Sequence, residues 1–247
     1  MSRWRLLGLG LGAYVLGLIA TAPATLLDAG LQQLSEGRLR LADARGTLWS
    51  GAGQIEMLDR MRRSGIAKDI TWQILPAYLL RGQLRGEVGL DLAAKRFPVT
   101  LSLAGIEVAE ADIDLPAAAL GVAIPKLAPL GLSGDMLLRI ARVSFARNAV
   151  HGNATLQWRG AGSAFTRVSP LGDYEMRFVG EGNAVRASLR TLQGPLQLDG
   201  QGSWASGGNP VFAGNARIPP EHMQQLAPLM RMIAFERGQG NFELQLK

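Results

Sequence analysis

An uninterrupted apolar run near the N-terminus constrains this chain more than any other feature. No charged residue lies between Arg5 and Asp28, and most of residues 6–27 are Leu, Gly, Ala, Val or Ile. A bilayer core about 30 Å thick needs roughly 20 apolar residues at a rise of about 1.5 Å each. The run therefore predicts a membrane-spanning helix or a signal sequence, and no other segment of the chain does.

The residues that flank this run predict its orientation. Two arginines precede it and Asp28 follows it, and positive residues next to a span stay on the cytoplasmic side of the membrane. We therefore expect a cytoplasmic tail over residues 1–5, a transmembrane helix over residues 6–27 and a translocated β-rich domain over residues 28–247.

A cleaved signal sequence is the alternative to an anchor. Ala20-Thr21-Ala22 resembles the small-residue pattern of a cleavage site. However, Pro23 would follow the cut and is poorly tolerated there, and the run is longer than the about 7–15 residues typical of a signal-peptide core. We therefore predict an anchor that is not cleaved.

Charge and cysteine content narrow the range of partners. The 247 residues carry a formal net charge of +6, which would suit nucleic acid, but the arginines are scattered singly along alternating segments. The one cluster, at residues 60–63, is flanked by residues typical of a solvated loop. We predict no nucleic-acid partner, and contact with anionic lipid headgroups stays open. The chain has no Cys, so a translocated domain must be stabilised by its core and its sheet.

Apolar and polar residues alternate with a period of two over much of the chain after residue 38. The clearest case is residues 83–92, where alternation gives one apolar face and one wet face. The 31 glycines are spread among such segments, as expected of turns between many short strands. We predict a mainly β fold in which an N-terminal transmembrane helix precedes a curved antiparallel β-sheet domain with a few short helices.

The expected elements follow from this pattern. Strands are expected at residues 38–41, 55–58, 66–72, 83–92, 98–103, 106–115, 136–143, 149–158, 174–179, 185–192, 196–204, 211–216 and 241–247. Helical segments are expected at residues 26–34, 74–80, 117–120 and 220–233. Pro23 should stop the first helix, and residues 46–53 should form a glycine-rich bend. Glu110, Asp112 and Asp114 form an acidic row that we expect to face arginines of a neighbouring strand.

Residues that catalysis or metal binding would need are sparse. His151 and His222 have no acidic residue at a ligand-like spacing. Ser50 lacks the full G-x-S-x-G pattern and the strand-turn-helix context of a nucleophile elbow, and no phosphate-binding loop occurs. We predict no catalytic, metal-binding or cofactor-binding residue and no cofactor, which favours a structural or binding role over an enzyme.

A short motif after the apolar run resembles that of a known family. The motif residues are Gly46, Thr47, Leu48, Trp49, Ser50, Gly51 and Trp72. An apolar segment at residues 75–80 follows the motif, ahead of Gly82. With one N-terminal span and a β-rich remainder, this arrangement resembles protein N of the type II (general) secretion pathway over nearly the whole chain.

The resemblance implies an accessory or structural subunit of the type II protein secretion system of a Gram-negative bacterium. It implies a single-pass protein of the inner membrane, with a cytoplasmic N-terminus and its bulk in the periplasm. The implied partners are other type II secretion subunits in the inner membrane and periplasm, together with membrane lipid. The family has no catalytic residues to carry over, and the oligomeric state is left open.

Trp49 and Trp72 lie beside glycines in this motif. We interpret both as large aromatics that fill a corner of the core, and anchoring of a partner protein is the alternative.

A second, more distant resemblance offers another function. The pattern is similar to the AsmA-like periplasmic β-folds, in which a long curved sheet forms an apolar groove for lipid. A sheet that curls without closing must cover its apolar face with helices or use that face for a ligand. The alternative function is therefore a periplasmic lipid-binding or lipid-transfer module, capped by the apolar helices near Leu26, Leu120 and Leu226.

Overall fold

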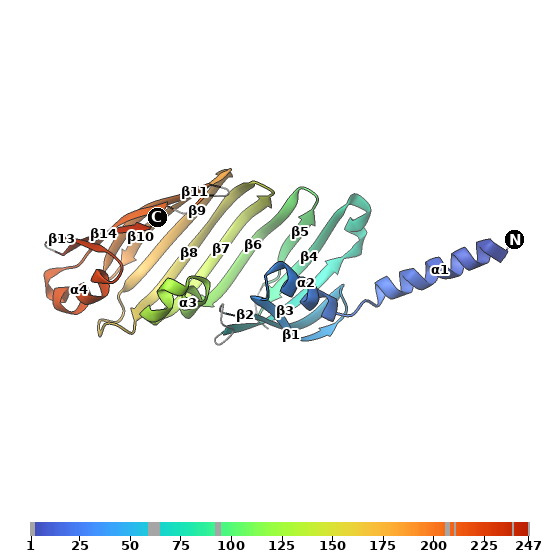
Figure 1. The fold of residues 1–247 in the computed structure, drawn as a ribbon, viewed down its shortest axis with the longest axis horizontal. Coiled ribbons are helices and arrows are strands. Elements are labelled where there is room, and N and C mark those ends of the chain that lie inside the picture. The colour runs from blue at the N-terminus through green and yellow to red at the C-terminus, as the bar shows by residue number, and fades with distance from the viewer. Residues whose placement is uncertain are drawn as a thin grey trace. The chain divides into compact units, whose positions relative to one another are not determined.

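The structure is a computed structural model that describes residues 3–58, 65–91, 95–205, 208–209, 211–238 and 240–246. Contacts divide the chain into two compact units, residues 1–96 and 97–247. Each unit is built mainly from antiparallel strands joined by short turns (Figure 1). The arginine cluster at residues 60–63 lies outside the described residues.

The first unit combines helices with a four-stranded sheet. Its elements are α1 (Arg3–Ala20), α2 (Thr25–Leu34), β1 (Leu39–Gly46), β2 (Ser50–Leu58), β3 (Gly65–Leu75), the 3₁₀ turn η1 (Pro76–Arg81) and β4 (Gln83–Leu90). Strands β1 to β4 pair in sequence order, each antiparallel to the next.

The apolar run near the N-terminus is divided between two helices. α1 ends at Ala20 and α2 begins at Thr25, because Pro23 cannot donate a backbone hydrogen bond and disfavours helical geometry at Ala22. The expected stop at Pro23 and the predicted second helix after it are confirmed, and the first helix ends at Ala20, before the boundary at residue 27 that the apolar run predicts. Within the part of the chain that the structure describes, no helix combines the length and the apolarity that crossing a bilayer requires.

Helix α2 and the residue that ends it protect the outer edge of β1. Asp28 Oδ1 accepts a hydrogen bond from the Leu41 amide at 2.8 Å, and Ser35 Oγ accepts one from the Leu39 amide at 2.9 Å. These side chains occupy donors that another strand could otherwise use. Gly37, with φ of 76°, lets the chain leave the helix toward β1.

The second unit is a larger antiparallel sheet with short helices at its connections. Its elements are β5 (Phe97–Ser102), β6 (Gly105–Pro116), α3 (Ala118–Ala123), η2 (Pro125–Leu130), β7 (Leu132–Ala146), β8 (Ala149–Ser163), β9 (Gly172–Gly182), β10 (Ala184–Gln193), β11 (Gln197–Ala205), β12 (Val211–Arg217), η3 (Pro220–His222), α4 (Met223–Arg231), β13 (Phe235–Gly238) and β14 (Asn241–Leu246). Strand order follows the sequence from β5 to β12, and β14 then lies between β12 and β13. The predicted mainly β, antiparallel fold with a few short helices is confirmed.

Alternation sorts the side chains of the second unit onto two faces. One row across β7 to β10, in register from strand to strand, contains Leu138, Leu156, Met176 and Leu189. The neighbouring row on the opposite face contains Arg139, Thr155, Arg177 and Ser188. We call these two sides the apolar face and the polar face of the second unit.

Ion pairs join neighbouring strands on the polar face. Asp112 on β6 lies 4.0 Å from Arg139 on β7, and Glu107 lies 3.6 Å from Arg142. The prediction that the acidic row on β6 faces arginines of a neighbouring strand is therefore confirmed at Asp112. Because these side chains are largely exposed, each ion pair adds little to the stability of the fold. Its main effect is to balance opposite charges on the polar face.

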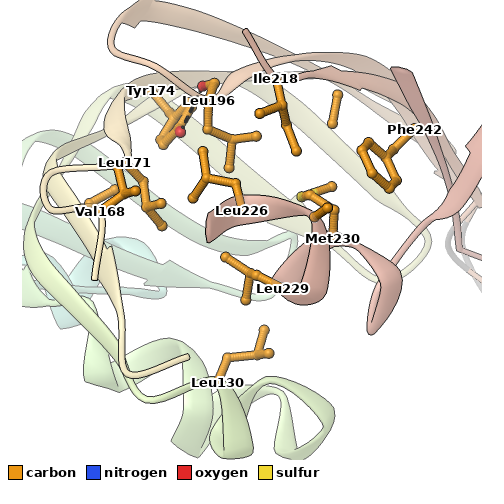
Figure 2. Packing of buried hydrophobic residues seen from close by; sticks show 13 residues of the cluster. Leu130, Val168, Leu171, Tyr174, Leu196, Ile218, Leu226, Leu229, Met230 and Phe242 are labelled. Atoms are coloured by element: carbon orange, nitrogen blue, oxygen red, sulfur yellow. Dashed lines mark hydrogen bonds between the residues drawn. The ribbon is translucent and has the colours of Figure 1, made fainter. Parts of the chain in front are cut away.

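Helix α4 covers one part of the apolar face and forms the main core of the second unit. Leu226 and Met230 on α4 have no exposed surface, and the side chain of Phe242 on β14 is 1 % exposed. In Figure 2, Leu226 and Met230 on α4 face Tyr174 on β9, Phe242 on β14 and Ile218, which directly follows β12. The Tyr174 hydroxyl donates a hydrogen bond to Leu196 O at 2.9 Å, so the buried phenol is satisfied, and burial raises the pKa of Tyr174 above its usual range.

Glu175 is a buried charged residue on the polar face. Arg177 Nε and Arg190 Nη2 lie 2.8 and 2.7 Å from its Oε1, and Gln157 Nε2 lies 3.2 Å from its Oε2. Burial acts to raise the pKa of Glu175, but hydrogen bonds from Gln157, Arg190 and Arg177 outweigh burial and hold the pKa below its usual range. The carboxylate thus ties β8, β9 and β10 together in its ionised form.

Some local predictions differ from the structure. The last helix ends at Arg231 rather than Ile233, and the strand β13 that follows was not predicted, because its four residues (Phe235–Gly238) lack a clear alternation. The bend expected over residues 46–53 is confined to the loop before Ser50. Beyond that loop, Gly51 and Gly53 belong to β2, where glycine permits close approach of a neighbouring strand or side chain.

Glu175→Gln should make the stability of the protein less dependent on pH in the acid range. Because the native pKa is lowered, ionised Glu175 stabilises the fold above the ordinary carboxyl pKa of about 4.3, and this contribution is lost as the pH falls through the native pKa. Urea unfolding at a series of pH values between about 3 and 7 measures the slope. The exposed Glu221→Gln should keep the wild-type slope, and an equal slope for both variants would contradict this role of Glu175.

Candidate functional site

The seven motif residues gather where the β1–β2 hairpin meets the end of α1. Residues 47–49 form the hairpin loop between Gly46 and Ser50. The Thr47 amide donates to Ser50 O at 2.9 Å, and Thr47 Oγ1 accepts hydrogen bonds from the amides of Trp49 and Ser50, each at 3.2 Å. Gly46 has φ of +95°, and a Cβ there would lie 2.5 Å from Ser50 O, so only glycine fits this turn without strain.

The loop supplies donors to the chain segment that leaves α1. The Trp49 indole Nε1 donates to Ile19 O at 2.8 Å, and the Leu48 amide donates to Ala22 O at 2.8 Å. In the opposite direction, the Ala24 amide donates to Gly46 O at 3.3 Å. Carbonyl groups in the last turn of a helix have no partner within the helix. The loop therefore acts as a cap that joins α1 to the sheet.

Trp72 on β3 supports this loop from the sheet. Its indole Nε1 donates to Thr47 O at 3.2 Å, and its side chain is 7 % exposed and packs in a small core with Ala24 and Leu41. A Cβ at Gly51 would lie 2.4 Å from Trp72 Cζ2 and 2.3 Å from a backbone oxygen of β1. The motif glycine at position 51 thus makes room for the indole of Trp72.

The two tryptophans differ in their surroundings. Trp72 is buried, as its core-filling interpretation requires. Trp49 is only half-buried and lies outside that core, so the same interpretation of Trp49 is wrong. Its ring is held at the surface because its N–H reaches out to the α1 backbone instead of packing inward.

The remaining contacts of this site involve residues that sequence reasoning missed. Ile19 and Ala22 contribute only backbone carbonyls, and Ile74 contributes an amide that donates to Trp49 O at 2.6 Å. Every residue has these backbone groups, so residue type does not predict which of them form contacts. The one sequence signal for this site is the helix stop at Pro23 ahead of a turn that contains a tryptophan.

No constellation typical of metal or nucleophilic chemistry surrounds this loop. Ser50 lies in a hairpin between two strands, which differs from the strand-to-helix turn of a nucleophile elbow. Among the described residues, no group of three or more His, Asp or Glu side chains could hold a metal ion. What the loop offers is a set of directed hydrogen bonds between a helix end and a sheet.

The fold and the site together define a mainly β protein in which a turn of residue pattern G-T-x-W-x-G joins an N-terminal apolar helix to an antiparallel sheet. A family model described as type II secretion system (T2SS), protein N, matches residues 37–245. The chain belongs to this family, which makes it a component of the type II secretion system and confirms the resemblance inferred from the motif. No curated protein and no solved structure matches the chain.

Gly51→Ala should destabilise the first unit, because the added Cβ collides with the Trp72 indole and the β1 backbone. We expect the free energy of unfolding to fall by about 1–3 kcal/mol. Gly30→Ala is the matched control, because α2 leaves open space around that position, and it should raise the free energy by up to about 1 kcal/mol. Urea unfolding followed by tryptophan fluorescence measures both, and equal effects would contradict the packing of Trp72 over Gly51.

Proposed function

We propose that the chain is a single-span inner-membrane subunit of the type II secretion system, with residues 6–27 as its anchor and its β-rich region acting in the periplasm by protein contact. The observation that carries this proposal is the family match over residues 37–245. Catalysis plays no part in the proposed role, and the other subunits of the same machine are the proposed partners.

The surface of α1 supports the proposed anchor. Leu11, Val15 and Ile19, spaced four residues apart, are 66, 44 and 49 % exposed, and Leu18 is 54 % exposed. Exposed apolar side chains on successive turns of one helix are costly in water and stable in lipid. Arginines before the apolar run and Asp28 after it support a cytoplasmic N-terminus.

The joint between helix and sheet suggests how such a subunit would act. Since the hairpin loop bonds to the end of α1, the first unit would be held at the membrane surface rather than hanging on a free linker. Partner subunits in the same membrane would then meet a surface of fixed orientation. The motif residues are, in this proposal, the parts that fix the orientation.

Anchored and unanchored chains should differ in secretion. We expect the full-length protein to stay in the membrane pellet after alkaline extraction and to form crosslinks with identified type II secretion subunits. A matched chain in which a cleavable signal peptide replaces residues 1–18, and which keeps Ile19, Ala22 and Ala24 in place, should reach the periplasm, lose these crosslinks and secrete type II substrates at least several-fold less. Unchanged secretion of every type II substrate in a deletion strain would contradict the proposal.

A second candidate function is lipid binding on the apolar face of the second unit. Leu101, Ile106 and Phe145 occupy one row across β5 to β7 and are 46, 44 and 48 % exposed. The main core formed by α4 includes none of these three residues, so this end of the face could accept acyl chains. A lipid there would remove the row from water.

Native mass spectrometry of the full-length protein tests this second candidate. If the row binds lipid, phospholipid should remain bound after detergent is removed in the gas phase, and Ile106→Asp with Phe145→Asp should lower the retained fraction at least several-fold. Val179→Asp is the matched control, because Val179 is 42 % exposed on the polar face. Equal retention in both variants, or none in the wild type, would contradict lipid binding by this face.

A further inference from the structure

An exposed apolar turn lies in the first unit between β3 and β4. Its 3₁₀ turn η1 (Pro76–Arg81) presents Leu79 and Leu80 with exposed fractions of 45 and 94 %. Neither leucine belongs to a core cluster of the described residues, and Leu80 is almost completely exposed. Exposed apolar side chains of this kind indicate contact with a membrane or with another molecule.

Aromatic and cationic side chains surround these leucines. The Arg81 and Arg85 guanidinium carbons lie 5.8 and 5.3 Å from the centre of the Tyr78 ring, within the range of cation–π contact. No ion pair between described residues includes either arginine. Tyrosine and arginine beside exposed leucines are typical of segments at the boundary between lipid headgroups and acyl chains.

Hydrogen bonds place the start of this turn next to the end of α1. The Ile74 amide donates to Trp49 O at 2.6 Å, and the indole of the same Trp49 donates to Ile19 O at 2.8 Å. Ile74 is two residues before Pro76, where η1 begins. Trp49 therefore links the end of α1 to the end of β3, where η1 begins, through one hydrogen bond on each side.

We propose that η1 is a second membrane contact, in which Leu79 and Leu80 enter the lipid surface on the side where residues 6–27 emerge. Tyr78, Arg81 and Arg85 then lie at headgroup level, where the two cations complement phosphate and anionic lipid. This inference rests on the proposed anchor. A protein partner fits less well, because two leucines provide far less than the about 800 Å² that a stable protein interface buries on each side.

The absence of natural cysteine permits a direct test in the full-length protein. A single Leu80→Cys variant carries an environment-sensitive fluorophore and is reconstituted into phosphatidylcholine and phosphatidylglycerol vesicles that contain a quencher on the lipid tails. We expect at least twofold quenching and a blue-shifted emission at position 80. Ala67→Cys is the matched control, since Ala67 is exposed near the opposite end of β3, about 23 Å along the strand from Ile74, and its label should show neither change.

A label on α1 separates failure of this inference from failure of the anchor. Leu18→Cys should be quenched if residues 6–27 span the bilayer. Quenching at position 18 without quenching at position 80 would overturn the membrane contact alone, and absence of quenching at position 18 would overturn the proposed anchor. A label at position 80 that is shielded from aqueous iodide but not quenched by lipid would identify a protein contact instead and would also overturn the inference.

The cationic rim provides an independent variant. Arg81→Glu with Arg85→Glu in the Leu80→Cys chain should reduce quenching at position 80 at least twofold in vesicles that contain phosphatidylglycerol, and should have a smaller effect in pure phosphatidylcholine. Both arginines are exposed, so the fold should persist, and this is checked by an unchanged urea midpoint. Equal quenching before and after the charge reversal would overturn the proposed headgroup contact.

Discussion

The hydrogen-bonded joint between the end of α1 and the β1–β2 hairpin is the constraint on which the first unit depends. A helix that stops leaves carbonyl groups without donors, and here the stop at Pro23 is followed by an isolated bridge between Pro23 and Thr47. The Leu48 amide and the Trp49 indole supply donors to Ala22 and Ile19. The end of α1 before Pro23 is thus the place where the helix is attached to the β1–β2 hairpin.

The motif residues divide this task among them. Gly46 makes the turn, Thr47 stabilises it through its hydroxyl, and Gly51 leaves room for Trp72. Trp72 holds the loop against the small core, while Trp49 extends to the helix. Trp72 is the buried member, and the loop residues Thr47 and Trp49 are fixed mainly by hydrogen bonds to their neighbours.

The sheet could be predicted from the sequence to a large extent, whereas the joint could not. A period of two assigns a side chain to a face wherever one face is apolar, which is why the strand containing residues 83–90 and the acidic residue Asp112 opposite Arg139 were predictable. Pro23 likewise predicted the end of a helix. The contact between Trp49 and Ile19 spans thirty positions and uses a backbone carbonyl, so no periodicity or residue type reveals it. The same limit explains the wrong expectation that Trp49 fills the core.

Hydrogen exchange at the Leu48 amide tests the joint most directly, since this amide donates to Ala22 O only if the end of α1 is docked on the hairpin loop. In the full-length protein reconstituted in lipid, the account predicts that this amide exchanges at least 100-fold more slowly than the amide of Asn148, which lies at the exposed tip of the β7–β8 hairpin. Protection on this scale corresponds to local opening that costs about 3 kcal/mol. Exchange at the same rate as at Asn148 would contradict the account.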